Sequence, residues 1–183
     1  MTLLSGQGLA LVRGGRLLFE GLEFSLDAGE GLHLVGPNGA GKSSLLRMIA
    51  GLLPPTAGRI ERAGIALADD QLALDRERPL RSALAWWGGP GLDRAMEAFG
   101  LEALADVPVR MLSTGQARRA RLARVVASNA PLWLLDEPFN GLDSANGEAL
   151  DRVIAHHREG GGCVVIASHS APRGDWQRLE LGR

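Results

Sequence analysis

The chain has 183 residues, a formal net charge of −1, 45% hydrophobic residues and 22% charged residues. This length suits one ordinary domain, and the composition allows a buried core. Proteins that coat DNA or RNA usually carry a basic excess, so the near-neutral charge argues against nucleic acid as the main partner.

The lone cysteine, Cys163, lies in an apolar run and excludes an internal disulfide framework or a cysteine metal site. The sequence contains no signal-peptide pattern and no apolar run of the roughly 18 residues that a membrane-spanning helix needs. We therefore expect a soluble protein whose contact with any membrane comes through a partner.

The N-terminal part predicts a β-rich beginning followed by one strand and one helix. Residues 1–30 alternate apolar and polar residues with glycine breaks, which is typical of antiparallel strands joined by turns. Residues 31–36 are short, apolar and ended by glycine, which indicates a buried strand. Residues 42–53 carry leucines at helical spacing, and we expect this helix to end at Pro54.

The rest of the chain alternates helices with two more buried strands. Residues 80–89 and 92–104 show the amphipathic pattern of helices within a helical insert. Residues 131–138 and 163–169 predict buried strands, and residues 144–160 predict a helix between them. Buried strands that alternate with helices indicate a largely parallel sheet of α/β type.

The stretch GPNGAGKS matches the phosphate-loop pattern G-x-x-x-x-G-K-[ST] in full, between a predicted strand and a predicted helix. This context argues against a chance glycine-rich turn. Glycines let backbone N–H groups approach phosphate oxygens, and the following helix adds its positive N-terminal end. Lys42 would reach the β- and γ-phosphates, and Ser43 would bind Mg²⁺. The predicted ATP-binding residues are Gly36, Pro37, Asn38, Gly39, Ala40, Gly41, Lys42, Ser43 and Ser44.

Two acidic residues follow the predicted strand at residues 131–138. Asp136 comes where it can hold Mg²⁺ directly or through water, and Glu137 is placed to polarise an attacking water. Solvated acids at a strand end are the alternative, which the complete phosphate loop makes weaker. Because Glu137 would give a water molecule a base, the pair favours hydrolysis over transfer to a substrate hydroxyl.

The stretch LSTGQ lies about twenty residues before Asp136 and opens an arginine-rich helix. Ser113 is a favourable N-cap and Gly115 lets the backbone approach an anion, so we expect a second phosphate-binding helix start. One ATP does not need two such sites from one subunit. Two copies that face each other head to tail would use both.

The arginines of this helix raise the alternative of a nucleic-acid-binding surface. On a helical wheel Arg118, Arg121 and Arg124 share one side, which we interpret as an ordinary solvated face. Arg119 falls among apolar residues, and we expect it to form an internal ion pair.

Taken together, these motifs resemble those of the ABC-transporter ATPases. LSTGQ is similar to their signature motif LSGGQ, with Thr114 in place of the first glycine. In that family the motif binds the ATP held by the other copy. The residues that the resemblance assigns to it are Leu112, Ser113, Thr114, Gly115 and Gln116.

Further family elements occur in the family's order. Gln71 resembles the Q-loop glutamine, which binds Mg²⁺ and senses the membrane partner. His169 resembles the switch histidine that contacts the γ-phosphate, so the resemblance implies that His169 and Glu137 are catalytic. The metal ligands it implies are Ser43, Gln71 and Asp136. The D-loop, which crosses the dimer interface, corresponds to Asn140, Gly141, Leu142 and Asp143.

The resemblance also implies a fold. It is that of a P-loop NTPase of ABC-ATPase type, in the α/β class, with a mixed sheet core and an N-terminal antiparallel β part. An α-helical subdomain would be inserted at about residues 72–115, within a single domain of residues 1–183. The implied ligands are ATP and Mg²⁺.

Within this family, residues 13–58, 78–88 and 132–143 are similar to the ATP-binding subunits of haem exporters of bacterial cytochrome c maturation, the CcmA group. The likeness implies integral membrane subunits as partners, a second copy in an ATP-dependent dimer, and a position on the cytoplasmic face of the inner membrane. It implies haem export or the release of haem from a chaperone. The partners would handle the haem, which this chain would not bind directly.

Two other functions stay open. The motifs are shared with the ATPases of other ABC importers and exporters, which are the main alternative. Soluble ABC ATPases of DNA repair or translation carry long coiled-coil insertions or two cassettes in one chain, and this sequence has neither.

Two details call for a specific expectation. ABC ATPases commonly place an aromatic residue some thirty residues before the phosphate-loop lysine, where its ring stacks on adenine, whereas here Val12 or Arg13 occupies that position. Trp86 and Trp87 are adjacent, so on a helix they point about 100° apart. We expect one of them to line a groove for a helix of a membrane subunit, with core packing of both as the alternative.

Overall fold

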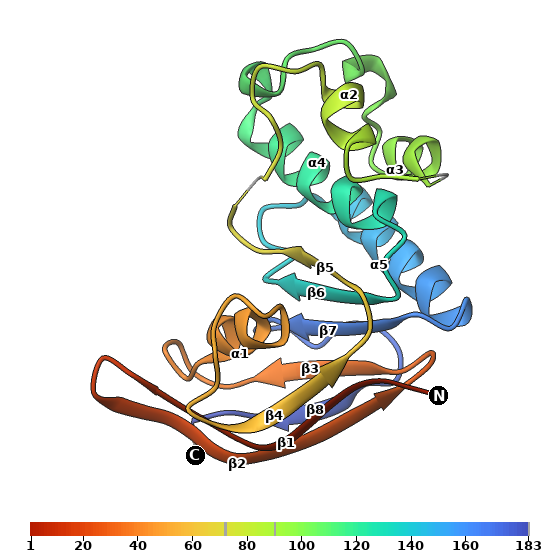
Figure 1. Ribbon diagram of the computed structural model, residues 1–183. Helices are drawn as coiled ribbons and strands as arrows, with labels where there is room; N and C mark the ends of the chain where they lie inside the picture. Colours follow the sequence, from red (N-terminus) through yellow and green to blue (C-terminus); the bar gives the residue numbers. More distant parts are fainter. Residues whose placement is uncertain (72, 90, 183) are drawn as a thin grey trace.

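Two β-sheets and a group of helices make up the structure, a computed structural model that describes residues 1–71, 73–89 and 91–182 (Figure 1). In chain order the elements are β1 (Thr2–Arg13), β2 (Arg16–Asp27), β3 (Gly31–Val35), α1 (Lys42–Ile49), β4 (Ala57–Arg62), β5 (Ile65–Ala68), α2 (Leu80–Ala85), α3 (Leu92–Ala98), the 3₁₀ turns η1 (Glu102–Leu104) and η2 (Val109–Met111), α4 (Thr114–Ala127), β6 (Leu132–Asp136), α5 (Ser144–Glu159), β7 (Cys163–Ala167) and β8 (Gln177–Glu180).

The N-terminal sheet is antiparallel, with the strand order β2-β1-β4. β1 and β2 form a long hairpin in which Arg13 pairs with Arg16. Gly14 and Gly15 make the turn with φ angles of 58° and 76°. Positive φ at both central residues matches the turn whose twist suits a two-residue hairpin. The antiparallel strands predicted from the alternating pattern are therefore confirmed.

The second sheet has the strand order β5-β6-β7-β3-β8, and its strands pair in parallel. Its central strands are buried on both faces. Leu132 and Leu134 of β6 pack in a cluster with α1 and the N-terminal sheet, whereas Trp133 and Leu135 pack with α4 and α5. Burial on both faces explains why these strands are apolar almost throughout. The α/β fold is thus confirmed, with the antiparallel strands in a sheet of their own.

The helix α1 ends earlier than the sequence predicts. It stops at Ile49 rather than continuing to Pro54, because Gly51 adopts a left-handed φ of 78°. The Gly51 N–H donates to the Met48 carbonyl at 3.0 Å, and the Leu52 N–H donates to the Arg47 carbonyl at 2.9 Å. These two bonds are the Schellman pattern by which a glycine closes a helix.

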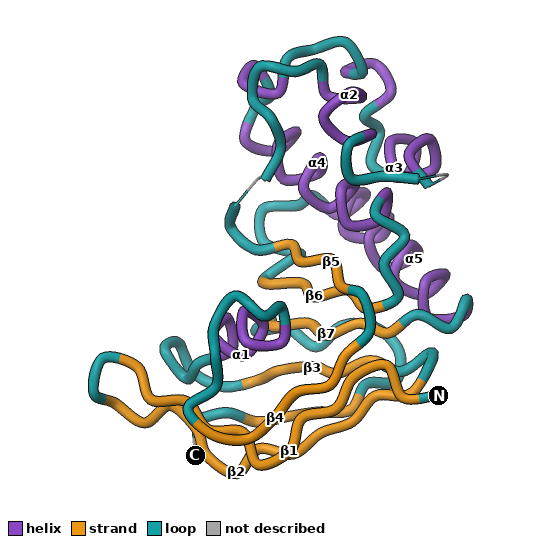
Figure 2. The backbone as a smooth tube through the Cα atoms, in the orientation of Figure 1, coloured by secondary structure: helices purple, strands orange, loops and turns teal. Residues whose placement is uncertain are grey.

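The helices α2, α3 and α4 lie at the end of the molecule away from the N-terminal sheet (Figure 2). α2 ends at Ala85, just before the paired tryptophans, and α3 ends at Ala98 because Gly100 follows with a φ of 57°. Both helices are shorter than predicted. Leu72, where the predicted helical insert begins, lies outside the described residues. Within the described ranges, no helix is long and apolar enough to cross a bilayer.

Candidate active site

The phosphate-loop sequence forms a tight loop between β3 and α1. Gly36, Gly39 and Gly41 all have positive φ angles, of 146°, 80° and 101°. A Cβ at Gly36 would run into the backbone carbonyl of Leu181, so the loop closes there only with glycine. Lys42 is buried, and its Nζ donates to the Gly36 carbonyl at 2.7 Å. The cationic head thus lies over the loop, whose backbone and α1 N-terminus form an anion-binding shape.

A cleft of about 620 Å³ opens beside this loop. That volume is typical of sites for small molecules and cofactors. Its lining brings together the hairpin of β1 and β2, the phosphate loop with the start of α1, the end of β6, and the segments that follow β6 and β7. The lining residues are Arg13, Leu18, Asn38, Gly39, Gly41, Lys42, Ser43, Ser44, Asp136, Glu137, Asn140 and His169.

Asp136 lies at the carboxyl end of β6, on the floor of this cleft. Burial raises the pKa of its carboxyl, while a hydrogen bond from the Ser43 hydroxyl acts in the opposite direction. A carboxylate and a hydroxyl that meet in a partly buried place offer the oxygen ligands that Mg²⁺ prefers, and a cation there would offset the cost of burying the charge. The residues present therefore fit a Mg²⁺ ion.

Glu137 follows in a conformation that non-glycine residues rarely adopt, with a φ of 46°. Its N–H donates to the Ala167 carbonyl at 2.8 Å, which fixes the end of β6 against the end of β7. The Glu137 carboxylate lies 3.6 Å from Nε2 of His169. Strained backbone of this kind persists where surrounding structure holds it, and it is found mostly at active sites. A carboxylate and an imidazole thus lie next to each other in the cleft that Lys42 also lines.

The LSTGQ stretch begins α4 as predicted. Ser113 is the N-cap: the Gln116 N–H donates to its Oγ at 3.3 Å, and the Ser113 N–H donates to Gln116 Oε1 at 2.8 Å. Gly115 faces open space, where a Cβ would meet no atom within 4 Å. This reciprocal capping box occupies the Gln116 side chain. The exposed backbone around Gly115 is left for contact with another molecule.

A second hollow of about 590 Å³ lies between α4 and the end of β6. Thr114 of the LSTGQ stretch lines this hollow, and several of the other lining residues also line the first cleft. The lining residues are Ser43, Arg47, Asp70, Thr114, Ala117, Arg118, Arg121, Asp136, Glu137 and Asn140.

The NGLD stretch has two structural roles. Asn140 lines both hollows, so it lies with the candidate catalytic residues. Asp143 is the N-cap of α5, because the Asn146 N–H donates to its Oδ1 at 2.8 Å. This backbone hydrogen bond is the main cause that lowers the Asp143 pKa. Gly141 turns the chain between them with a φ of 67°.

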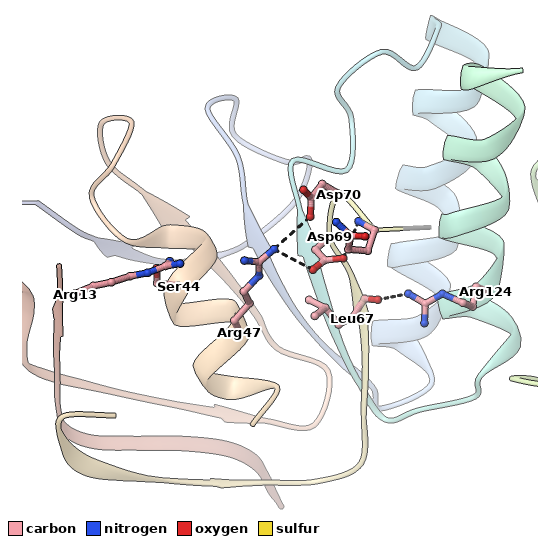
Figure 3. Close-up of polar contacts among 8 residues, drawn as sticks. Arg13, Ser44, Arg47, Leu67, Asp69, Asp70 and Arg124 are labelled. Atoms are coloured by element: carbon pink, nitrogen blue, oxygen red, sulfur yellow. Dashed lines mark hydrogen bonds and ion pairs between the residues drawn. The ribbon is translucent and has the colours of Figure 1, made fainter. Parts of the chain in front are cut away.

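Gln71 is exposed and does not belong to the lining of either hollow, whereas its neighbour Asp70 lines the second. The Gln71 N–H donates to Asp69 Oδ1 at 3.0 Å. The Arg47 guanidinium of α1 reaches Asp69 at 3.4 Å and Asp70 at 3.3 Å (Figure 3). Sequence reasoning missed the roles of Arg47 and Asp69. The only available signal was the pair of acids just before Gln71.

The arginines of α4 correct two expectations. The helical wheel predicts a solvated face for Arg118, Arg121 and Arg124, but Arg118 and Arg121 are half-buried. Arg124 is only 5% exposed, because β5 and Trp87 cover it. The predicted ion pair of Arg119 is replaced by hydrogen bonds, because its Nη1 donates to the carbonyls of Phe99 at 2.7 Å and Gly100 at 3.3 Å. Neither Arg124 nor Arg119 is therefore free to contact nucleic acid.

Comparisons with known proteins bear on the fold and the family of the chain. The ABC transporter family model matches residues 19–140. The chain is 56% identical over 177 residues to the cytochrome c biogenesis ATP-binding export protein CcmA of Sphingopyxis alaskensis, covering 93% of this chain and 91% of the relative. It is 58% identical over 165 residues to the protein of that name from Novosphingobium aromaticivorans, covering 88% and 85%. A solved ATP binding subunit of an ABC transporter is similar with a TM-score of 0.85 and 26% identity, covering 92% of this chain and 80% of that one.

Proposed function

The chain belongs to the ABC transporter family, within its group of cytochrome c biogenesis ATP-binding export proteins, and we propose that it hydrolyses ATP to drive haem export or the release of haem from a chaperone. The cleft beside the phosphate loop supports the ATPase part of this proposal, and the likeness to the cytochrome c biogenesis relatives supports the haem part. The phosphate loop, two acids at the end of β6 and a histidine after β7 line one hollow large enough for a nucleotide.

ATP binding begins with its phosphates. The backbone N–H groups of the loop and the N-terminus of α1 would hold the β- and γ-phosphates. The Lys42 ammonium would move from the Gly36 carbonyl to the phosphate oxygens, which offer it a full negative charge instead of a dipole. Ser43 and Asp136 would hold Mg²⁺, with Gln71 as a proposed further ligand once its loop closes on the cleft. When bound, the ion neutralises negative charge on the phosphates.

Hydrolysis requires a water molecule aligned with the γ-phosphate. The Glu137 carboxylate would accept a hydrogen bond from this water and draw off its proton as the oxygen bonds to the γ-phosphorus. The bond from the γ-phosphorus to its bridging oxygen breaks, and ADP leaves with that oxygen. His169, whose Nε2 lies 3.6 Å from the Glu137 carboxylate, would contact the γ-phosphate beside Glu137. The pair would thus hold both the nucleophile and the group under attack.

The LSTGQ residues complete the site in a dimer. Residues 112–116 include the start of α4, and the backbone at Gly115 faces open space. One ATP bound at the phosphate loop does not need this second helix N-terminus from the same chain. We propose that two copies meet head to tail, with the LSTGQ stretch of each binding the γ-phosphate on the other. Asn140–Asp143 would lie along this interface. ATP then acts as the bridge between the copies, and its hydrolysis releases them.

We further propose how the chain is organised and which partners it contacts. We propose that residues 72–115 act as a helical subdomain of a single domain, residues 1–183. This subdomain would contact integral membrane subunits, which would place the chain on the cytoplasmic face of the inner membrane. Haem would be handled by those subunits and not bound by this chain.

The test of the haem proposal is complementation. In bacteria that lack their own ATPase of cytochrome c maturation, this chain should restore haem-stained c-type cytochromes. Lys42→Ala and Glu137→Gln should not, although both accumulate to the same level. The exposed Arg59, which lies on β4, supplies the control Arg59→Ala, and we expect it to restore them fully. Full restoration by Glu137→Gln would contradict the proposal, as would failure of the wild type while it hydrolyses ATP.

A further inference from the structure

Arg124 occupies an unusual place for an arginine, because it lies in the last turn of α4 and is only 5% exposed. Its Nη2 donates to the backbone carbonyl of Leu67 in β5 (Figure 3). Its guanidinium carbon lies 4.8 Å from the centroid of the Trp87 ring, within the range of a cation–π interaction. Within the described ranges its Nε has no hydrogen-bond partner. Removing a charged group from water costs free energy, and the few contacts of this buried cation must offset that cost.

The hydrogen bond of Arg124 to Leu67 connects it with residues beside the ATP cleft. Two residues after Leu67, the buried carboxylate of Asp69 is paired with Arg47 of α1 at 3.4 Å and accepts the Gln71 N–H at 3.0 Å. Asp69 also attracts Arg124 electrostatically. The end of β5 is thus held between a cation from the phosphate-loop helix and a cation from α4, and it sets the start of the Gln71 segment.

The cation–π contact of Arg124 with Trp87 connects it with the surface of the protein. Trp87 is 41% exposed and meets Trp86 edge to face, with 5.4 Å between ring centroids. The two rings line a hollow of about 300 Å³ with Ala73, Leu74, Asp75, Arg78 and Ala83. Ala73 and Leu74 belong to the segment that follows Gln71. The same hollow therefore borders both the paired tryptophans and the chain that leaves the ATP cleft.

We propose that Arg124 is a positioning residue that couples this tryptophan-lined hollow to the ATP cleft. The proposal rests on the proposed function, in which the helical subdomain contacts membrane subunits, and it takes a helix of such a subunit as the occupant of the hollow. A helix that moves Trp87 changes the environment of the Arg124 cation. Arg124 then shifts its hydrogen bond to the Leu67 carbonyl. This shift moves the end of β5, and with it the ion pair between Asp69 and Arg47. Since such coupling is reciprocal, nucleotide in the cleft must also alter the surroundings of Trp87.

The first experiment measures turnover of the ATPase assembled with its membrane subunits and of the ATPase alone. Arg124→Met removes the cation and keeps most of the side-chain volume. We expect the stimulation of turnover by the membrane subunits to fall about fivefold, a normal size for lost coupling. The KM for ATP of the ATPase alone should stay within about twofold of the wild type, whereas a merely structural defect would change both. Arg124→Lys should restore part of the stimulation, because it keeps the charge but loses the planar fork.

Arg119→Met is the matched control. Arg119 lies on the same helix and also donates to backbone carbonyls, but those of Phe99 and Gly100 instead of Leu67. It should keep full stimulation. If Arg124→Met does not assemble with the membrane subunits, Trp87→Leu tests the contact between Arg124 and Trp87 by changing the other partner. It should cause a similar loss, and the double variant should lose no more than either single change. Full stimulation in Arg124→Met or in Trp87→Leu would overturn the proposal.

The second experiment needs no partner, so it separates this proposal from the proposed function. In the background Glu137→Gln, Trp86→Phe and Trp176→Phe, the remaining tryptophans are Trp87 and the buried Trp133. ATP should shift the fluorescence, and Trp87→Phe should abolish the shift. Arg124→Met should abolish it too, while calorimetry shows an ATP affinity within about threefold of the parent. A shift that survives Arg124→Met, or no shift in the parent, would overturn the proposal. A wild type that the membrane subunits do not stimulate would instead contradict the proposed function.

Discussion

The Glu137 carboxylate and the His169 imidazole lie 3.6 Å apart, one after β6 and the other after β7. Their strands are parallel neighbours, so their carboxyl ends meet at the same edge of the sheet. A backbone hydrogen bond from Glu137 to Ala167 locks this edge at 2.8 Å. The sheet therefore fixes where both segments begin, with Glu137 directly after β6 and His169 two residues after β7.

The first prediction is that Glu137→Gln binds ATP but hydrolyses it about 10²–10⁴-fold more slowly, the usual effect of losing a positioned base. The amide keeps the shape of the carboxylate but cannot draw a proton from water. The uncleaved γ-phosphate should then hold two copies together. Sizing chromatography with Mg-ATP should show more dimer for the variant than for the wild type.

Glu148→Gln provides the control for this change, because Glu148 is an exposed acid on α5 outside the cleft. Its turnover should match the wild type. Unchanged turnover in Glu137→Gln would remove the assignment of Glu137 as the base.

The parts of the structure that were predictable are those whose signals are local. The phosphate loop, the strand before it and the capping serine of α4 each show their pattern within a dozen residues. β4, β5 and β8 are short, and β4 (AGRIER) and β8 (QRLE) carry mixed polar residues, so the partner strands decide their structure and the sequence pattern does not predict them.

The same limit applies to the side chains around the cleft. A helical wheel places Arg124 on the polar side of α4, yet β5 and Trp87, which are remote in the sequence, bury it. Arg47 and Asp69 are separated by 22 residues, and nothing in their spacing indicates that they meet. Such contacts depend on how the sheets pack, which no local pattern encodes.

A second prediction concerns Trp86, which is 72% exposed beside the hollow lined by both tryptophans. Because both tryptophans are exposed, the alternative in which both pack in the core is wrong. Trp86→Ala should weaken co-purification with the membrane subunits by roughly tenfold or more, because aromatic anchors carry a large share of interface energy. The ATPase activity of the separate chain should not change. Leu52 is also apolar and 67% exposed but lies outside this hollow, so Leu52→Ala should leave co-purification intact.

A third prediction concerns the pH dependence of stability. The His157 ring stacks on Trp133 with 3.7 Å between centroids, and burial lowers its pKa from 6.5 to about 4. The neutral ring is favoured in the folded state, so its contribution is complete above about pH 6.5 and is lost as the pH falls toward about 4. The loss should be on the order of 1–2 kcal/mol once solvent screening is allowed for.

Urea unfolding of the wild type and of His157→Phe at several pH values between about 7 and 4.5 measures this contribution. Phenylalanine keeps the stack but cannot be protonated. The difference between the two free energies of unfolding should change across this interval. The exposed neighbour His156 supplies the control His156→Phe, which should keep the slope of the wild type. Parallel curves for the wild type and His157→Phe would contradict the prediction.

The last prediction concerns the base of the nucleotide. Arg13, rather than Val12, lines the cleft, together with Leu18, and its Nη1 donates to Ser44 Oγ at 3.2 Å. A guanidinium and a leucine offer the base a weaker surface than an aromatic ring, whose stacking is worth roughly 1–3 kcal/mol. We therefore expect the isolated chain to bind ATP weakly and to discriminate poorly between ATP and GTP, because the phosphates supply most of the affinity. Arg13→Tyr should strengthen ATP binding about tenfold, and calorimetry with both nucleotides measures it. Arg13→Lys, which keeps the charge without the planar group, should not. A wild type that strongly prefers ATP, together with no gain from tyrosine, would show that Arg13 does not form the base surface.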